Sequence, residues 1–222
     1  MSKVVAMIPA RMGSQRLKKK NLCELDGVAL ITRAIRKCKE TGCFDEIWVN
    51  SENTEFGVIA EQEDVFFHQR PEQLGDNNAT SEQFVHEFLT EHSCDFLIQV
   101  HSIAPLLGSD EVKGFTEYFT SSSNDVLLSC IEDQIEVAYQ GQPVNFTFVE
   151  KTNSQDLKPL QRITWSISGW KSDVYLNAIN NGECATYSGN VGFYPVSAVS
   201  GHVIKTQEDL DIAEALLRVI SK

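Results

Sequence analysis

The segment Ile8–Asn21, which reads IPARMGSQRLKKKN, follows a short apolar run at Lys3–Ile8 that is long enough for one buried strand. The segment contains one glycine, one serine, two arginines and three consecutive lysines, and the residues Leu30–Cys38 beyond it carry apolar side chains at helical spacing. A glycine lets a backbone turn sharply next to a ligand, and the N–H groups of such a loop can point at anionic oxygens. The order of strand, cationic loop and helix therefore predicts a phosphate site. A basic surface turn without a ligand is the alternative, because no glycine-rich fingerprint is satisfied.

The composition places this cationic loop in an acidic protein. The chain has 222 residues, of which 42% are hydrophobic and 23% are charged, so we expect a single domain over residues 1–222 with room for a modest insertion. A net charge of −12 argues against a nucleic-acid-binding protein. Five cations nevertheless lie between Arg11 and Lys20, and a local positive site on an acidic body suits the capture of a nucleoside triphosphate. Arg11, Arg16 and Lys20 are the candidates for charge-assisted hydrogen bonds to phosphate.

The sequence gives no sign of a membrane span or a disulfide framework. No apolar run approaches the length of a span, and the first residues, MSKVVAMIPAR, are too soon charged for a signal peptide. The six cysteines are scattered and form no C-x-x-C pair. We therefore expect reduced thiols, no membrane partner and a cytoplasmic location.

Short apolar segments alternate with helical patterns over the first 130 residues. Strict alternation of this kind predicts an α/β fold with a doubly wound, mostly parallel sheet, helices on both faces and ligands bound at the carboxyl ends of the strands. Ser81 is the predicted N-cap of one helix, and Ser109 is followed by Asp110 and Glu111, which place acids in a first turn where the helix dipole favours them. Strands are expected at Val4–Ile8, Glu46–Asn50, Val65–His68, Phe96–Val100 and Val126–Cys130, and helices at Leu30–Thr41, Glu55–Gln62, Ser81–His92 and Asp110–Ser121.

The pattern changes after Ile131. Alternating residues at Ile135–Tyr139 and Asn145–Val149 predict a hairpin that turns through Gly141–Pro143. We interpret residues 131–170 as an inserted β-rich arm, with a plain surface hairpin as the alternative. The chain is then expected to form a helix at Ser172–Asn180, a strand at Asn190–Tyr194 and a helix at Gln207–Val219.

The loop after the first strand resembles the signature of the acylneuraminate cytidylyltransferases, which activate sialic-acid-type nonulosonate sugars, and of the related CMP-Kdo synthetases. Their pattern is I-P-A-R-x-G-S-[KR]-[RG]-x-x-x-K-N, and Gln15 stands where the family has a cation. Nine positions over fourteen residues match: Ile8, Pro9, Ala10, Arg11, Gly13, Ser14, Arg16, Lys20 and Asn21.

The resemblance implies a nucleotide-diphospho-sugar transferase-like fold and the transfer of CMP from CTP to an acidic keto-sugar, with release of pyrophosphate. It implies catalytic roles for Arg11, Lys20 and Gln99, and a homodimer formed through the arm. The residues that it implies for CTP binding are Ala10, Arg11, Gly13, Ser14, Arg16, Asn21, Arg70 and Ser81.

Two further segments carry the resemblance. Residues 70–81 resemble R-P-x-x-L-[AS]-x-[DN]-x-[AST]-[ST], which lines the nucleotide pocket in the family and brings in Arg70 and Ser81. Residues 99–106 match a Q-x-T-S-P-L segment only if two extra residues are allowed. His101 lies in this segment, and a hydrogen-bonded structural role for it is the alternative to catalysis. Asn50-Ser51-Glu52, which ends the second strand, is expected to cap or turn the chain.

The expected cofactor is Mg²⁺, but the usual ligands are absent. The family carries I-D-[IVT]-D-T-x-x-D-[LF]-x-x-A-E, whereas Val203 and Lys205 stand here in place of the first two aspartates, so the metal ligands are unknown. Three explanations are open. The metal is held by CTP and water, Lys205 contributes charge in place of an ion, or the protein binds its ligand without turnover.

The functional hypotheses therefore differ in class. The leading one is a cytidylyltransferase for a sialic-acid-like nonulosonate, and the alternatives are a Kdo-type or other sugar nucleotidyltransferase, a catalytically impaired CTP- or sugar-binding relative, or an α/β domain whose basic loop meets an acidic protein. The sequence does not say which sugar is activated. Cations that could meet its carboxylate are Lys151, Lys158, Arg162 and Lys171.

Overall fold

The computed structural model describes residues 2–220 and contains a seven-stranded sheet in the order β11-β7-β10-β6-β1-β4-β5. All neighbouring strands run parallel except at β10, which is antiparallel to both β6 and β7. The predicted doubly wound, mostly parallel sheet is therefore confirmed. The strands are β1 (Val4–Pro9), β4 (Glu46–Ser51), β5 (Phe66–Gln69), β6 (Phe96–Val100), β7 (Val126–Asp133), β10 (Leu160–Lys171) and β11 (Val191–Pro195).

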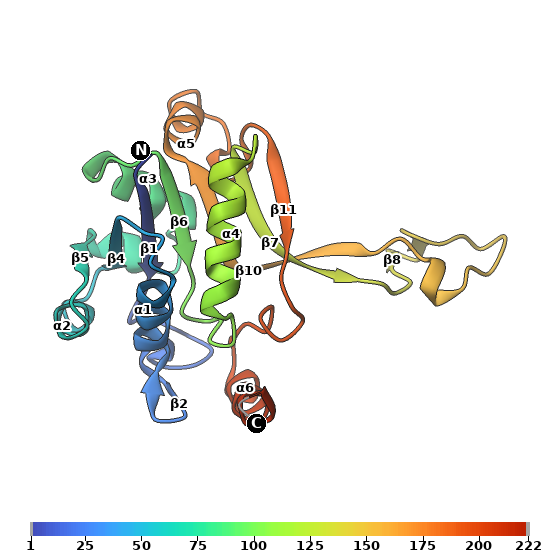
Figure 1. The fold of residues 1–222 in the computed structure, drawn as a ribbon, viewed down its shortest axis with the longest axis horizontal. Helices are drawn as coiled ribbons and strands as arrows, with labels where there is room; N and C mark the ends of the chain where they lie inside the picture. The colour runs from blue at the N-terminus through green and yellow to red at the C-terminus, as the bar shows by residue number, and fades with distance from the viewer. Residues whose placement is uncertain (1, 221–222) are drawn as a thin grey trace.

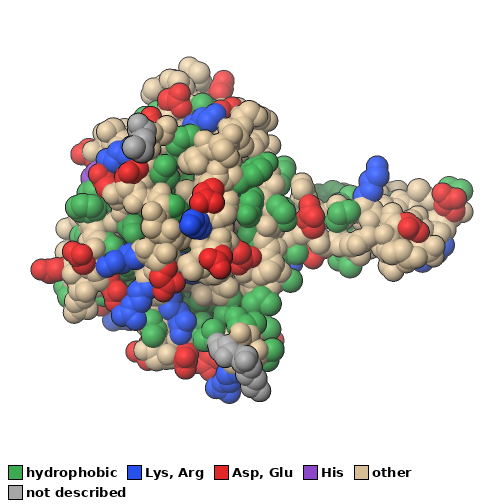
Figure 2. Space-filling model, in the orientation of Figure 1, with side chains coloured by type: hydrophobic (Ala, Val, Ile, Leu, Met, Phe, Trp, Pro, Cys, Tyr) green, Lys and Arg blue, Asp and Glu red, His purple; other side chains and the backbone are tan. Residues whose placement is uncertain are grey.

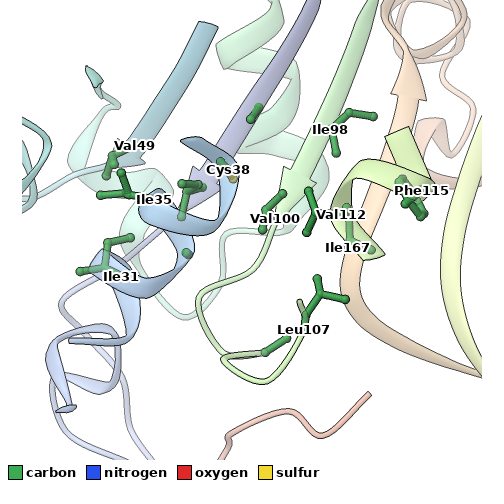
Figure 3. Packing of buried hydrophobic residues seen from close by; sticks show 14 of the residues in the cluster. Ile31, Ile35, Cys38, Val49, Ile98, Val100, Leu107, Val112, Phe115 and Ile167 are labelled. Atoms are coloured by element: carbon green, nitrogen blue, oxygen red, sulfur yellow. The ribbon is translucent and has the colours of Figure 1, made fainter. Parts of the chain in front are cut away.

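Helices cover both faces of the sheet because alternate residues of its central strands are buried on opposite sides. In β1, Ala6 and Ile8 pack in one cluster with α1 (Leu30–Thr41), α2 (Glu55–Gln62) and α4 (Ser109–Ser121). Figure 3 shows how Ile31 and Ile35 of α1 and Val112 and Phe115 of α4 meet the strands on this face. Val5 and Met7 pack on the other face against α3 (Ser81–Glu91) and α5 (Ser172–Asn180).

The predicted N-cap at Ser81 is wrong by one residue, whereas Asp110 and Glu111 do lie in the first turn of α4. Ser81 is the first residue of α3, and the cap is Thr80, whose side chain accepts from the N–H of Gln83 while the Gln83 side chain accepts from the N–H of Thr80. Ser109 is likewise the first residue of α4, and Gly108 precedes it as the cap. The loops that precede α3 and α4 therefore each end one residue before the serine.

The predicted insertion at 131–170 is too long. Residues Ile167–Lys171 of β10 pair with β6 inside the central sheet, so they are core rather than arm. Figure 1 shows the paired ends of β7 and β10 leaving the sheet and leading into a projecting segment, and we call residues 132–162 the arm. Within it β8 (Ala138–Tyr139) pairs with β9 (Gln142–Pro143), whereas the second predicted hairpin strand, Asn145–Val149, does not form.

A small substructure lies at the carboxyl ends of the parallel strands. The hairpin of β2 (Glu24–Leu25) and β3 (Val28–Ala29) packs with α6 (Gln207–Ile220) in a third apolar cluster. Leu17 of the cationic loop packs against this cluster, which therefore supports the loop from below in the view of Figure 1. Within residues 2–220, no helix combines the length and the apolar character that crossing a membrane requires.

Candidate active site

A pocket opens where β1, β5 and β6 end. Its volume is about 170 Å³. Five residues that the sequence singles out as site residues, Ala10, Arg11, Lys20, Asn21 and Arg70, line this pocket. Its other walls are Pro9, Phe84, His101 and Ile103. Three segments that are far apart in the sequence therefore meet at the edge of the sheet where the fold places ligands.

The remaining predicted site residues lie around the pocket rather than in its wall. Gly13 is exposed, and a Cβ there would meet no atom within 4 Å, so its backbone faces open space. Ser14 is half-buried in the same loop, Arg16 is exposed, and Ser81 is exposed at the start of α3. Gln99 is buried behind His101.

Arg70 is the most buried cation of the site, with 3% of its surface exposed. Its Nη2 donates to the carbonyl oxygen of Ala10 at 2.8 Å and to Glu52 Oε2 at 3.1 Å, and its Nη1 donates to Asn50 Oδ1 at 3.2 Å. The guanidinium carbon also lies 4.8 Å from the ring centroid of Phe84. Burial lowers the pKa of Arg70, and the neighbouring Glu52 carboxylate offsets part of that effect. Arg70 thus holds the end of β1 in place as well as lining the pocket.

Glu52 completes this arrangement. Its Oε1 accepts from the backbone N–H of Met12 at 2.8 Å while its Oε2 pairs with Arg70. The expectation of a plain turn or cap at this position misses the role, since Glu52 joins the second strand to the cationic loop. An acid directly after a strand, between two segments that carry arginines, is the sequence signal that could have found it.

Arg11 and Asn21 fix the loop to its neighbours. Arg11 Nη1 donates to the carbonyl oxygen of Asp76 at 2.8 Å and to Asn77 Oδ1 at 3.1 Å, which draws the 70–81 segment over the loop. Asn21 Nδ2 donates to the carbonyl oxygen of Arg11 at 3.0 Å, and Asn21 Oδ1 accepts from Ser102 Oγ at 2.7 Å. The loop is therefore held on both sides before any ligand arrives.

Positive charge accumulates around Lys20. Burial lowers the pKa of Lys20, and the positive charges of Arg16 and Arg11 lower it further. Asp209 offsets part of this effect, and Lys205 adds to it. A lysine surrounded mainly by other cations is stabilised by an anion that binds among them.

Gln99 and His101 form a second polar group beneath the pocket. Gln99 is 1% exposed, and its Oε1 lies 3.1 Å from His101 Nε2 and accepts from Ser168 Oγ at 3.5 Å. Its amide nitrogen has no partner within the described chain. The backbone N–H of His101 donates to the carbonyl oxygen of Ser166 at 3.2 Å. Ser166 lies beside the bulge of β10, where Trp165 takes a φ of 57°. This bulge places β10 against the pocket-lining loop.

We expect His101 to be neutral throughout the physiological range. Burial lowers its pKa from 6.5 to about 4, and the charge of Lys20 acts in the same direction. An NMR titration should therefore show an unprotonated imidazole as the pH falls from 7 towards about 4, whereas the same histidine in the urea-unfolded chain should titrate near 6.5. Because only the unfolded chain takes up this proton between those pKa values, the folding stability that His101 contributes should fall as the pH is lowered through that window. Titration of the folded protein near 6.5 would contradict this prediction.

The four cations proposed for the sugar carboxylate do not converge on the pocket. Lys151 pairs with Glu136 within the arm, and Lys158 is exposed there. Arg162 pairs with Asp133 at 2.7 Å. Lys171 lies beside Phe96 at the amino-terminal end of β6, at the opposite edge of the sheet, and is therefore wrong as a sugar contact.

The residues present do not fit a magnesium ion held by the protein at the expected place. Val203 packs against the apolar core, and Lys205 is a cation. Asp209 Oδ2 already accepts from the N–H of Lys205 at 2.9 Å, from the N–H of Thr206 at 2.8 Å and from Thr206 Oγ1 at 2.9 Å. Among residues 2–220, no three His, Cys, Asp or Glu side chains are grouped as a metal site requires.

The fold places the chain in a known structural class. It superimposes on the structure of CMP:2-keto-3-deoxy-manno-octonic acid synthetase complexed with CTP with a TM-score of 0.72, at 17% identity over 98% of this chain and 99% of that one. A cytidylyltransferase from Leptospira borgpetersenii gives a TM-score of 0.67 at 14% identity and covers 99% of this chain and 88% of its own. These likenesses confirm the nucleotide-diphospho-sugar transferase-like fold.

The sequence then gives the family. Residues 5–221 match the cytidylyltransferase family model, and the chain belongs to that family. It is 30% identical to the pseudaminic acid cytidylyltransferase of Campylobacter jejuni, over 70% of this chain and 72% of that protein. It is 27% identical to an N-acylneuraminate cytidylyltransferase of Streptococcus agalactiae over 84% of this chain, but spans only 48% of that longer protein. The resemblance carried by the cationic loop is thereby confirmed.

Proposed function

We propose that this chain is a nucleotidyltransferase that transfers CMP from CTP to an acidic, sialic-acid-like nonulosonate and releases pyrophosphate. The observation that carries the proposal is the cationic loop after β1, where Arg11 and Lys20 line one pocket and Arg16 lies beside it. This charge is concentrated in a chain whose net charge is −12. The names of the relatives from C. jejuni and S. agalactiae support a nonulosonate as the acceptor.

The chemistry follows from the charges of the pocket. A hydroxyl oxygen of the sugar forms a bond to the α-phosphorus of CTP, and the bond from that phosphorus to the oxygen shared with the β-phosphate breaks. The electron pair of the broken bond leaves with pyrophosphate, and the hydroxyl proton passes to water. Arg11 and Lys20 would hold the β- and γ-phosphates and neutralise the charge that spreads over them, which is the main catalytic requirement of such transfers.

Magnesium enters this proposal as an ion carried by CTP. Mg²⁺ commonly keeps several waters and is bound through substrate phosphates, and it then supplies additional charge neutralisation. The missing carboxylates also support the second candidate, a relative that binds CTP without turnover. The likeness in fold to a 2-keto-3-deoxy-manno-octonic acid synthetase keeps an eight-carbon acidic sugar as the alternative acceptor.

A pyrophosphate-release assay distinguishes these readings. The protein is incubated with each of the four ribonucleoside triphosphates and with sialic, pseudaminic, legionaminic or 2-keto-3-deoxy-manno-octonic acid, with and without Mg²⁺. We expect release only with CTP and a nine-carbon acid. Pyrophosphate release with the eight-carbon acid alone would mean that this acid, and not a nonulosonate, is the acceptor sugar. If calorimetry showed CTP binding but no pyrophosphate were released, the protein would be a relative that binds CTP without turnover. If the protein neither bound CTP nor released pyrophosphate, the proposal would be rejected.

We further propose that the protein works in the cytoplasm as a homodimer formed through the arm. The six cysteines are free thiols, which suits a reducing compartment. Apolar side chains are exposed along the arm, and Figure 2 shows hydrophobic patches on its visible face. Exposed apolar surface on a projecting hairpin suits contact with a second copy, since it has no body of its own chain to pack against. These side chains are Ile135, Tyr139, Val144, Phe148 and Val149.

Replacing two of these side chains should separate the dimer. Phe148 is 72% exposed and Val149 is 95% exposed, so serines at both positions remove apolar contact area without disturbing a core. Light scattering after gel filtration should give the mass of a dimer for the parent protein and of a monomer for the double variant. The matched control replaces Val219 and Ile220, which are 69% and 53% exposed on α6, and should remain dimeric. A monomeric parent protein would contradict the proposal.

A further inference from the structure

Hydrogen bonds join three segments of the site, which contain residues 20–21, 102–103 and 204–205. Asn21, which follows Lys20, accepts from Ser102 Oγ at 2.7 Å. The next residue, Ile103, accepts with its carbonyl oxygen from the N–H of Ile204 at 2.8 Å. Lys20 and Lys205 therefore lie on the two segments that flank the 102–103 turn. Leu17 and Ile204 pack in the same apolar cluster below them, which keeps the two outer segments together.

The side chain of Lys205 is free for a ligand. Its backbone N–H is used, since it donates to Asp209 Oδ2 in the turn that begins α6. Its side chain is exposed and has no hydrogen bond or ion pair with any residue between 2 and 220. The turn thus fixes the backbone at Lys205 and leaves its ammonium group available.

Two carboxylates of the site region, Asp209 and Glu52, already make contacts within the chain. Asp209 Oδ2 accepts three hydrogen bonds within its turn. Glu52 is divided between the N–H of Met12 and the guanidinium of Arg70. Mg²⁺ requires oxygen ligands in near-octahedral geometry. Lys20 in the pocket wall and Lys205 on the neighbouring segment are cations, which bind phosphate directly.

We propose that Lys205 acts with Lys20 as a direct contact of the CTP phosphates, in place of a divalent cation held by carboxylates of the protein. This inference rests on the proposed function and adds a catalytic residue to it. The lysine ammonium donates charge-assisted hydrogen bonds to phosphate oxygens, and the turn at the start of α6 fixes the backbone that carries it. It adds no bond-making step to the transfer described above.

Calorimetry of CTP binding in EDTA tests the inference, because it removes divalent cations and does not depend on turnover. Lys205→Ala should weaken CTP binding at least about tenfold, the size of one charge-assisted hydrogen bond to phosphate. Lys205→Arg keeps the charge, so its CTP affinity should stay within about threefold of that of the parent protein. This change is well under tenfold, which corresponds to about 1.4 kcal/mol. Lys113→Ala, which removes an exposed lysine on α4 far from the pocket, is the matched control and should leave the affinity unchanged.

Electron paramagnetic resonance with Mn²⁺ gives a second readout. The nucleotide-free protein should leave the Mn²⁺ signal unchanged, because the site offers the ion no set of free carboxylates. Tight Mn²⁺ binding without nucleotide, or unchanged CTP affinity in Lys205→Ala, would overturn the inference while leaving the proposed function in place. Failure of the parent protein to bind CTP, with or without Mg²⁺, would instead overturn the proposed function.

Discussion

Replacing Arg70 with methionine is expected to lower the unfolding free energy by about 3–5 kcal/mol, the cost of leaving one member of a buried ion pair without its partner. The Glu52 side chain that pairs with Arg70 is 11% exposed, and that of Arg70 is 2% exposed. Without the guanidinium, the Glu52 carboxylate and the carbonyl oxygen of Ala10 both lose a buried donor. Urea denaturation followed by circular dichroism measures the effect.

Two further variants distinguish the loss of the buried Arg70–Glu52 ion pair from the loss of any positive charge. Arg36 pairs with Glu63 at 2.7 Å but is 54% exposed, so Arg36→Met should destabilise the protein far less than Arg70→Met. Adding Glu52→Gln to Arg70→Met should recover part of the stability, because the uncompensated carboxylate is removed. If Arg70→Met and Arg36→Met proved equally mild, the buried pair would not be holding the end of β1.

Replacing Lys20 with alanine is expected to weaken CTP binding by about ten- to a hundredfold, since it removes one ammonium that donates to phosphate in a partly desolvated pocket. The pocket loses the cation around which Arg11 and Arg16 gather. Because the same contact is proposed to strengthen as charge spreads over the leaving pyrophosphate, turnover should fall at least as much as affinity. Calorimetry and the pyrophosphate assay measure the two effects separately.

Lys18 provides the control for this prediction. It stands two residues earlier in the same loop, is exposed, and does not line the pocket. Lys18→Ala removes the same charge from the chain and should change CTP affinity by less than about threefold, because Lys18, unlike Lys205, is not among the charges that shift the pKa of Lys20. Equal losses in the two variants would mean that the loop acts through its overall charge rather than through a contact at Lys20.

Much of the fold could be predicted because its signals are local. The apolar run of β1 and the periodic apolar residues of α1 and α6 need no long-range information, and these elements form where the pattern indicates. The place of β10 in the central sheet could not be found in this way, because it depends on pairing with β6. Its core half contains Ser166 and Ser168, whose hydroxyls are buried and hydrogen-bonded to other chain segments. Ile163, Trp165 and Ile167 alternate with polar residues as in a half-buried strand, but this pattern does not tell a hairpin arm from a strand of the central sheet.

The residues of the candidate site likewise fall into those that one local motif contains and those that only the fold brings together. Arg11, Lys20 and Asn21 could be predicted because one contiguous motif contains them. The pairing of Glu52 with Arg70, and the contact of Arg11 with the 76–77 turn, join segments that meet only after the sheet has formed. The family motif singles out Lys205, but its neighbourhood depends on the hydrogen bond between Ile204 and Ile103. Sequence patterns along one strand or helix do not carry that information.

A crystal structure of this protein soaked with CTP tests the central claim most directly. We expect the triphosphate to lie against the cationic loop, with phosphate oxygens within hydrogen-bonding distance of Arg11, of the backbone at Gly13 and of Lys20. A triphosphate bound elsewhere on the molecule, with these three residues unchanged and facing solvent, would contradict it.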